Sequence, residues 1–218
     1  MASVLLIDVD GTLIDSFPGI RDTLEKTLTE IDWPMPTEEM LARLPGPPLE
    51  VTFQGYGMRG DVLDTALATF RRHYTATGWS NSSLFPGWAQ GLARWKEDGL
   101  TLCTATSKSI SHASTMVEHL GVRPYFDFLG AASDDGARKT KAEVIEYVLE
   151  TQDLDPMRDN ILMIGDRSHD TDGASQFGIP TALVGWGHGT REEWDAADYF
   201  ARDFNDLERV VRGFANLR

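Results

Sequence analysis

Hydrophobic positions along the chain form short continuous runs that alternate with longer segments of helical period. Continuous runs of this kind are typical of strands that are buried on both faces. The predicted strands are residues 4–7, 100–105, 127–130, 161–164 and 181–184. The predicted helices between the later runs are residues 109–120, 139–150 and 169–177. This alternation predicts an α/β fold, in which helices cover both faces of a parallel sheet.

The interval from Ser16 to Leu84 interrupts the alternation. It contains long helical patterns and no clear strand, and the Pro-rich stretches DWPMP, LPGPPLE and FPG divide it. We therefore predict two domains. Residues 1–15 and 85–218 form an α/β core, and residues 16–84 form a helical insert.

Composition narrows the class of protein. The 218 residues include 34 Asp and Glu against 20 Lys and Arg, a formal net charge of −14. This balance repels nucleic-acid polymers and anionic membrane surfaces, so neither is an expected partner. A small anionic substrate remains compatible, provided that a metal ion and a few basic groups reverse the charge locally.

The cysteine count and the length of the apolar runs indicate the compartment. A single cysteine, Cys103, lies in an apolar run, which favours a buried structural thiol and excludes a disulfide within the chain. The first apolar run lacks a basic leader, and no run approaches the ~20 residues that span a bilayer. We expect a soluble, cytoplasmic protein.

Acidic residues follow two of the predicted strands. Asp8 and Asp10 precede Gly11 at the end of the first strand, and the segment after residues 161–164 carries Asp166, Asp170 and Asp172. An isolated D-x-D-G is more often a turn than a site. If both strand ends face one crevice, however, their carboxylates repel one another unless a hard cation such as Mg²⁺ lies among them.

Two further segments offer groups that bind anions. The stretch LCTATSKS carries the hydroxyls of Thr104, Thr106 and Ser107, and Lys139 and Lys141 lie at the start of the predicted helix 139–150. Acids for a metal, hydroxyls for oxygen atoms and a lysine for charge indicate phosphoryl transfer.

In this order, the blocks DVDGTLIDS, TATSK, RKTKAEVI and GDRSHD resemble the four motifs of the haloacid dehalogenase superfamily. The resemblance covers essentially the whole chain. Within the superfamily the sequence is similar to the phosphoglycolate phosphatase and bacterial 5'-nucleotidase-like group, whose small helical cap follows the first motif. The resemblance implies a Rossmann-like core, an inserted cap and a Mg²⁺-dependent phosphatase.

The resemblance also implies a role for each motif residue. Asp8 is the expected nucleophile, which forms an aspartyl-phosphate, and Asp10 is the expected general acid and base. The catalytic set is completed by Thr106 and Lys141. The implied Mg²⁺ ligands are Asp8, the Asp10 carbonyl, Asp166 and Asp170, the last directly or through water. The implied phosphate-binding residues are Val9, Asp10, Thr106, Ser107 and Lys141.

Three neighbours of these residues need separate interpretation. The alignment on KAEVI favours Lys141 over Lys139, which is then an exposed neighbour. We expect His169 to be a polar residue at a helix start and not a metal ligand, because the surrounding oxygen-rich set suits Mg²⁺. Asp172 is as compatible with solvent exposure as with a site role.

Substrate selection is assigned to the insert. The stiff LPGPPLE turn is the best candidate for a loop that reaches the substrate, so the predicted specificity residues are Arg43, Gly46 and Pro47, with Arg71 from FRRHY. Five aromatic residues of the insert could stack on a base, but such residues are more often core; they are Trp33, Phe53, Tyr56, Tyr74 and Trp79. We expect a small phosphorylated metabolite, and neither the ester nor the oligomeric state is specified.

Alternative functions keep the fold and change the chemistry. Dehalogenases of the superfamily lack the second acid of the first motif, so the presence of Asp10 argues against a dehalogenase. Phosphonatases use a cap lysine, and the insert's only lysine, Lys26, lies in the middle of a predicted helix, which argues against a phosphonatase. A sugar-phosphate mutase and a non-catalytic module that binds Mg²⁺ or a phospho-ligand remain the alternatives to a phosphatase.

Overall fold

The computed structural model describes residues 3–41 and 49–217. The chain divides into two compact units, Met1–Asp15 with Leu84–Arg218 and Ser16–Ser83. We call the first the α/β unit and the second the helical unit. The predicted specificity residues Arg43, Gly46 and Pro47 lie outside the described residues.

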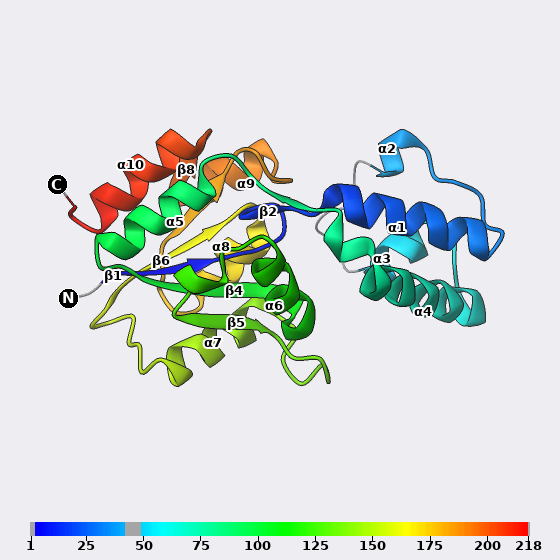
Figure 1. The fold of residues 1–218 in the computed structure, drawn as a ribbon, viewed down its shortest axis with the longest axis horizontal. Helices are drawn as coiled ribbons and strands as arrows, with labels where there is room; N and C mark the ends of the chain where they lie inside the picture. The colour runs from blue at the N-terminus through cyan, green and yellow to red at the C-terminus, as the bar shows by residue number, and fades with distance from the viewer. Residues whose placement is uncertain (1–2, 42–48, 218) are drawn as a thin grey trace. The chain divides into compact units, whose positions relative to one another are not determined.

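The α/β unit is built on a parallel sheet of six strands in the order β5-β4-β1-β6-β7-β8 (Figure 1). The strands are β1 (Ser3–Ile7), β4 (Thr101–Ser109), β5 (Phe128–Ala132), β6 (Asn160–Gly165), β7 (Thr181–Val184) and β8 (Tyr199–Ala201). The predicted α/β fold class is therefore confirmed. The strand β8 was not predicted, and β4 continues to Ser109, beyond the predicted end at residue 105.

Helices cover both faces of this sheet. They are α5 (Trp88–Glu97), α6 (Ile110–His119), α7 (Lys141–Thr151), α8 (Ser168–Ser175), α9 (Arg191–Ala196) and α10 (Phe204–Phe214), with the 3-10 turn η2 (Arg123–Tyr125). One buried cluster joins α7 and α8 to alternate residues of β1, among them Val4 and Leu6. Figure 1 shows α5 and α10 side by side across the sheet from α7, and their Trp88 and Phe204 rings lie 5.5 Å apart.

Strand register sets the edge where the acids emerge. β1 is the central strand, and its last residue, Ile7, pairs with Thr104 of β4 on one side and with Ile164 of β6 on the other. Asp8 after β1 and Asp166 after β6 therefore lie at the same carboxyl edge of the sheet, whereas β4 continues past Thr104 to Ser109.

The helical unit contains α1 (Phe17–Glu30), α2 (Glu38–Leu41), α3 (Leu49–Gly55), α4 (Gly60–Ala76) and the 3-10 turn η1 (Gly78–Ser80). Phe53 and Tyr74 are buried in its core, and Trp33, Tyr56 and Trp79 pack against that core. These five aromatic residues are accounted for by packing. A two-stranded ribbon pairs β2 (Ile14–Asp15) with β3 (Ser83–Leu84).

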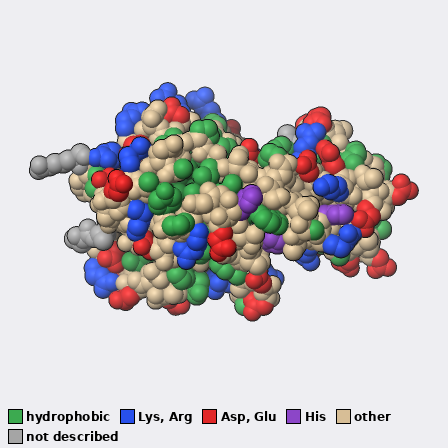
Figure 2. Space-filling view, in the orientation of Figure 1, with side chains coloured by type: hydrophobic (Ala, Val, Ile, Leu, Met, Phe, Trp, Pro, Cys, Tyr) green, Lys and Arg blue, Asp and Glu red, His purple; other side chains and the backbone are tan. Residues whose placement is uncertain are grey.

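Charged side chains of both signs are interspersed over the face drawn in Figure 2, and Lys and Arg form no continuous stripe on it. Among the residues that the structure describes, no helix has both the length and the apolar character needed to cross a bilayer.

Candidate active site

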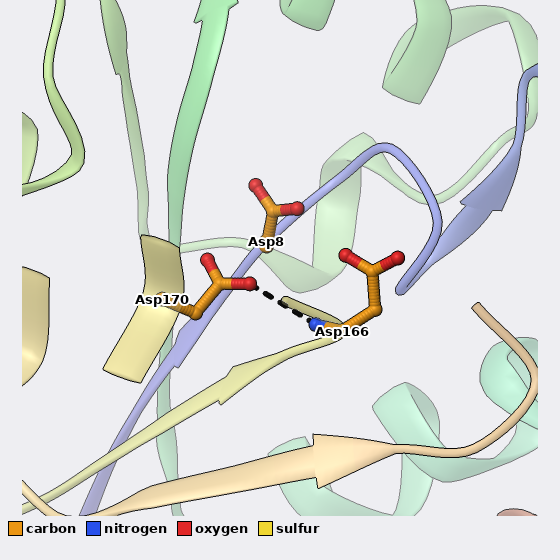
Figure 3. A group of neighbouring side chains, drawn as sticks. All are labelled: Asp8, Asp166 and Asp170. Atoms are coloured by element: carbon orange, nitrogen blue, oxygen red, sulfur yellow. Dashed lines mark hydrogen bonds between the residues drawn. The ribbon is translucent and has the colours of Figure 1, made fainter. Parts of the chain in front are cut away.

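Three buried carboxyl groups meet at the carboxyl edge of the sheet. Asp8 follows β1, Asp166 follows β6, and Asp170 lies in the first turn of α8. One oxygen from each lies within 4.8 Å of the other two, and Figure 3 shows the three groups gathered side by side. The sheet register brings Asp8 and Asp166 together, because their preceding residues belong to paired strands.

A buried lysine lies among these acids. The Nζ of Lys141 donates to Asp8 Oδ1 at 2.6 Å and to the Ala105 carbonyl at 2.6 Å, and it lies 2.8 Å from Asp170 Oδ1. Burial alone would lower the pKa of Lys141, but the two carboxylates raise it. Lys141 is therefore a fixed cation in contact with both acids.

One cation does not balance three acids. Burial raises the pKa of Asp8 to about 6, against the attraction of Lys141 and with repulsion from Asp170 and Asp10. Burial and repulsion from Asp8 and Asp170 raise the pKa of Asp166 to about 8. Full ionisation of the group is unfavourable unless further positive charge is present.

Asp170 is oriented by the start of α8. Its Oδ2 accepts from the Asp166 amide at 3.0 Å, drawn as the dashed line in Figure 3, and from the Arg167 amide at 3.2 Å. The side chain therefore caps the helix that carries it. Gly165 makes room for this arrangement, since an added Cβ there would lie 2.1 Å from the Asp170 carboxyl group.

Asp10 is paired with a lysine that the sequence did not identify. Lys108 Nζ donates to Asp10 Oδ2 at 2.8 Å and to Oδ1 at 3.1 Å. The side chain of Lys108 is only 9% exposed, and that of Asp10 is 33% exposed. Lys108 belongs to the block TATSK, and its place in that motif was the signal that could have revealed it.

The predicted phosphate-binding residues occupy different environments. Thr106 is buried, and its hydroxyl accepts from the Lys108 amide at 3.2 Å. Ser107 is exposed, whereas Val9 is buried in the turn after β1. Thr104 donates to the Gly130 carbonyl inside the sheet, so its hydroxyl is directed away from the acids.

The remaining described candidates have exposed side chains. His169, Asp172 and Lys139 are exposed, in agreement with the exposed position expected for Lys139. Arg71 is exposed on α4 in the helical unit. Neither His169 nor Asp172 belongs to the group of acids that could hold a metal.

A segment after β7 also reaches these acids, and we had assigned it no role. The His188 amide donates to Asp166 Oδ2 at 2.7 Å, and Trp186 Nε1 donates to the Thr12 carbonyl at 2.9 Å. The stretch VGWGHGT has no hydrophobic periodicity that would place it beside β1. Its position depends on how the chain returns from β7.

The donor set suits a hard divalent cation. Asp8, Asp166 and Asp170 offer only carboxylate oxygens, which are the ligands that Mg²⁺ and Ca²⁺ prefer. The raised pKa values of Asp8 and Asp166 indicate that a cation is needed to keep the group ionised. These residues therefore fit a magnesium ion.

A match to a family model identifies the family of this chain. The model described as haloacid dehalogenase-like hydrolase matches residues 5–184, which span both Asp8 and Asp166. The chain belongs to this hydrolase family. The family includes named phosphatases similar to this chain over most of its length.

Three curated relatives and one solved structure illustrate the match. Tyrosine-protein kinase PtkA of Mycobacterium tuberculosis is 37% identical over 85% of this chain, but the chain spans only 63% of that protein's length. A 5'-nucleotidase of Pseudomonas aeruginosa is 31% identical over 95% of this chain and 94% of its own. A phosphoglycolate phosphatase of Rhodospirillum rubrum is 30% identical over 86% of this chain and 81% of its own. The crystal structure of a predicted phosphatase from Clostridium acetobutylicum superposes with a TM-score of 0.88 at 29% identity, covering 98% of this chain and 99% of that one.

Proposed function

We propose that the protein is a Mg²⁺-dependent phosphomonoesterase that acts through an aspartyl-phosphate on Asp8. The observation that carries this proposal is the contact of buried Lys141 with both Asp8 and Asp170, beside Asp166. Lys141 supplies one fixed positive charge, and the three carboxyl groups together need a second cation. A site with both positive charges suits a dianionic phosphate.

In the first half-reaction, one bond to phosphorus forms and another breaks. Asp8 Oδ1 is held by Lys141, and the other oxygen, Oδ2, attacks phosphorus. The bond from phosphorus to the ester oxygen breaks, and the leaving oxygen takes a proton from Asp10. The products are the free alcohol and phosphorylated Asp8.

The second half-reaction regenerates the enzyme. Asp10, now ionised, removes a proton from a water molecule that attacks phosphorus. The bond from phosphorus to Asp8 breaks, and inorganic phosphate leaves. Asp10 is protonated again, so the cycle consumes one water molecule and one ester.

The other side chains bind and orient the substrate. Lys141, the Thr106 hydroxyl, and the backbone of Val9, Asp10 and Ser107 hold phosphate oxygens. Asp8, the Asp10 carbonyl, Asp166 and Asp170 would hold Mg²⁺, which supplies positive charge to the phosphate oxygens when it is bound.

The helical unit acts in this proposal as the cap that selects the leaving group, with Arg43, Gly46, Pro47 and Arg71 as its specificity residues. The substrate is a small phosphorylated metabolite, and the protein works in the cytoplasm. Phosphoglycolate and nucleoside 5'-monophosphates are the first esters to test, since two similar proteins are named for them.

A second candidate function follows from the name of one relative. Tyrosine-protein kinase PtkA is 37% identical to this chain over 186 residues. A kinase would transfer the phosphoryl group to a tyrosine hydroxyl instead of water. Both reactions could use Asp8, so the acceptor distinguishes them.

The decisive experiment measures phosphate release from a panel of esters by the purified chain. The panel contains phosphoglycolate, nucleoside 5'-monophosphates, sugar phosphates, a phosphotyrosine analogue and acetyl phosphate, each with Mg²⁺ and with chelator. We expect hydrolysis that requires Mg²⁺, is lost in Asp8→Asn and persists in Asp172→Asn, which changes an exposed acid of α8.

Other outcomes identify the alternatives. Hydrolysis that survives Asp8→Asn or chelation would overturn the mechanism. Isomerisation of a sugar phosphate without net phosphate release would indicate a mutase. Transfer from ATP to a tyrosine peptide would indicate a kinase, and binding without turnover would indicate a non-catalytic module.

A further inference from the structure

The loop after β7 contacts two parts of the candidate site at once. The Trp186 indole Nε1 donates to the Thr12 carbonyl at 2.9 Å, in the turn that follows Asp8 and Asp10. Two residues later, the His188 amide donates to Asp166 Oδ2 at 2.7 Å. We call Gly185–Gly189 the clasp loop, because it joins the turn after β1 to the acid after β6.

The backbones in this region lie too close for any side chain between them. An added Cβ at Gly187 would lie 2.4 Å from the Gly11 carbonyl oxygen and 2.4 Å from Asp166 Cβ. Gly11 itself has φ +81, a conformation that favours glycine. The clasp loop and the first turn therefore fit directly against each other.

The indole of Trp186 is packed between two aromatic rings. Its centroid lies 6.3 Å from that of Phe85 and 6.4 Å from that of Phe204. The Phe85 amide donates to the Leu13 carbonyl at 3.1 Å, beside Thr12. This packing fixes the direction of the indole N–H.

Hydrogen bonds within the first turn also shape it. The Gly11 amide donates to the Ile14 carbonyl at 2.9 Å, and the Leu13 and Ile14 amides both donate to the Val9 carbonyl. These bonds close the turn, and the Asp8 amide, which donates to the Ile164 carbonyl at 2.9 Å, anchors the first residue of the turn to β6. The bond from Trp186 joins the turn to the clasp loop, which also contacts Asp166.

We propose that Trp186 is a positioning residue, which acts through the Thr12 carbonyl to hold the turn bearing Asp8 and Asp10 in register with Asp166. Its effect on turnover rests on the proposed phosphatase function, whereas its effect on the turn does not. Small displacements of reacting groups are costly in catalysis, so the loss of this bond should be visible in kcat.

The test replaces the indole with a ring that keeps the packing and lacks the N–H. Trp186→Phe is compared with Trp194→Phe, since Trp194 is also partly buried and its Nε1 has no hydrogen-bond partner among the described residues. Trp194 packs on Phe200 at 4.9 Å between centroids, so both variants shrink one packed ring.

Two readouts are measured on the full chain. We expect Trp186→Phe to lower kcat about tenfold with KM changed less than about twofold, while Trp194→Phe changes both by less than about twofold. By amide hydrogen exchange, we expect Gly11, Leu13 and Ile14 to exchange about tenfold faster in Trp186→Phe only. A kcat within about twofold of wild type, or unchanged exchange at these amides, would overturn the proposal.

The wild-type protein supplies a test that needs no variant. We expect the Trp186 indole proton to exchange more slowly than that of Trp194, because only the former donates to a carbonyl. Equal exchange rates would count against the bond. If the wild type shows no phosphatase activity, the proposed function fails, and the exchange measurements still decide the role of Trp186 in the turn.

Discussion

The Lys108 ammonium group contacts both carboxylate oxygens of Asp10, at 2.8 and 3.1 Å. This ion pair joins the end of β4 to the turn after β1, and the lysine side chain is almost fully buried. The proposed acid and base is therefore restrained by a neighbouring cation.

Replacing Lys108 should reduce turnover. In Lys108→Met, Asp10 loses the contact that fixes its position, and we expect kcat to fall by about 10- to 100-fold. Lys96→Met is the control, because Lys96 forms a similar pair with Asp127 at 2.7 Å, where both side chains are about one-third exposed. Steady-state kinetics on the best ester of the panel checks the prediction, and equal effects of the two variants would contradict it.

Lys141 and Lys139 offer a sharper comparison, since they lie two residues apart. Lys141→Met leaves Asp8 and Asp170 buried without their cation, so we expect unfolding free energy to fall by about 3 kcal/mol in metal-free protein. Activity should be undetectable. Lys139→Met removes an exposed charge and should change unfolding free energy by less than about 0.5 kcal/mol.

Chemical denaturation with and without Mg²⁺ measures both variants. If Lys141→Met unfolds during purification, Lys141→Arg tests the same position with its charge retained. We expect low activity in Lys141→Arg, because the planar guanidinium does not reproduce three contacts made by one ammonium group. Wild-type turnover in either variant would contradict the proposed role.

The central strands could be predicted because their residues are apolar on both faces. Residues of β1, β6 and β7 form continuous apolar runs, and the structure confirms strands at these positions. β8 is three residues long, and Tyr199 and Phe200 are partly exposed, so no run marks it. Polar residues hid the last part of β4 in the same way.

Site residues differ in how far sequence alone can identify them. Asp8 and Asp166 each follow an apolar run, so parallel strands predict a common edge for them. The contact of Lys108 with Asp10 depends on β4 lying beside β1, and that of Trp186 with Thr12 depends on the path after β7. Neither relationship leaves a periodic pattern in the sequence.

Gly173 lies against the aliphatic part of Lys141, which gives a test of how tightly this lysine is held. An added Cβ at Gly173 would lie 2.7 Å from Lys141 Cγ and 2.9 Å from Lys141 Cβ. We expect Gly173→Ala to displace Lys141 and to lower kcat by about tenfold or more. Unfolding free energy should fall by about 1 to 3 kcal/mol.

Gly213→Ala is the matched control. Gly213 also lies in a helix, α10, and an added Cβ there meets nothing within 4 Å. We expect this variant to keep full activity and to gain up to about 1 kcal/mol, because alanine favours the helix more than glycine does. Loss of activity in both variants, or in neither, would contradict the proposed contact.

Glu193 links the start of α9 to the start of α8, the helix that carries Asp170. Its carboxylate accepts from the Thr190 amide at 2.7 Å and the Ser168 amide at 3.0 Å, and Arg167 Nε donates to both oxygens. Burial would raise the pKa of Glu193, but the Thr190 and Ser168 amides and Arg167 lower it to about 2.

The sign of the resulting pH dependence follows from this lowered pKa. A carboxylate with a folded pKa below its ordinary value near 4.5 stabilises the protein above that value, and its contribution is lost as pH falls toward 2. After allowance for solvent screening, we expect Glu193→Gln to lower unfolding free energy by about 1 to 2 kcal/mol at neutral pH. The difference from wild type should shrink between about pH 4.5 and pH 3.

Urea unfolding of both proteins at pH 7, 4.5 and 3 measures this difference. Glu146→Gln, which changes an exposed residue of α7, controls for the loss of one negative charge and should differ from wild type by less than about 0.5 kcal/mol at each pH. A Glu193→Gln deficit of the same size at pH 3 as at pH 7 would mean that the side chain acts through packing. A deficit that disappears with acid identifies the ionised carboxylate as the group that joins the two helix starts.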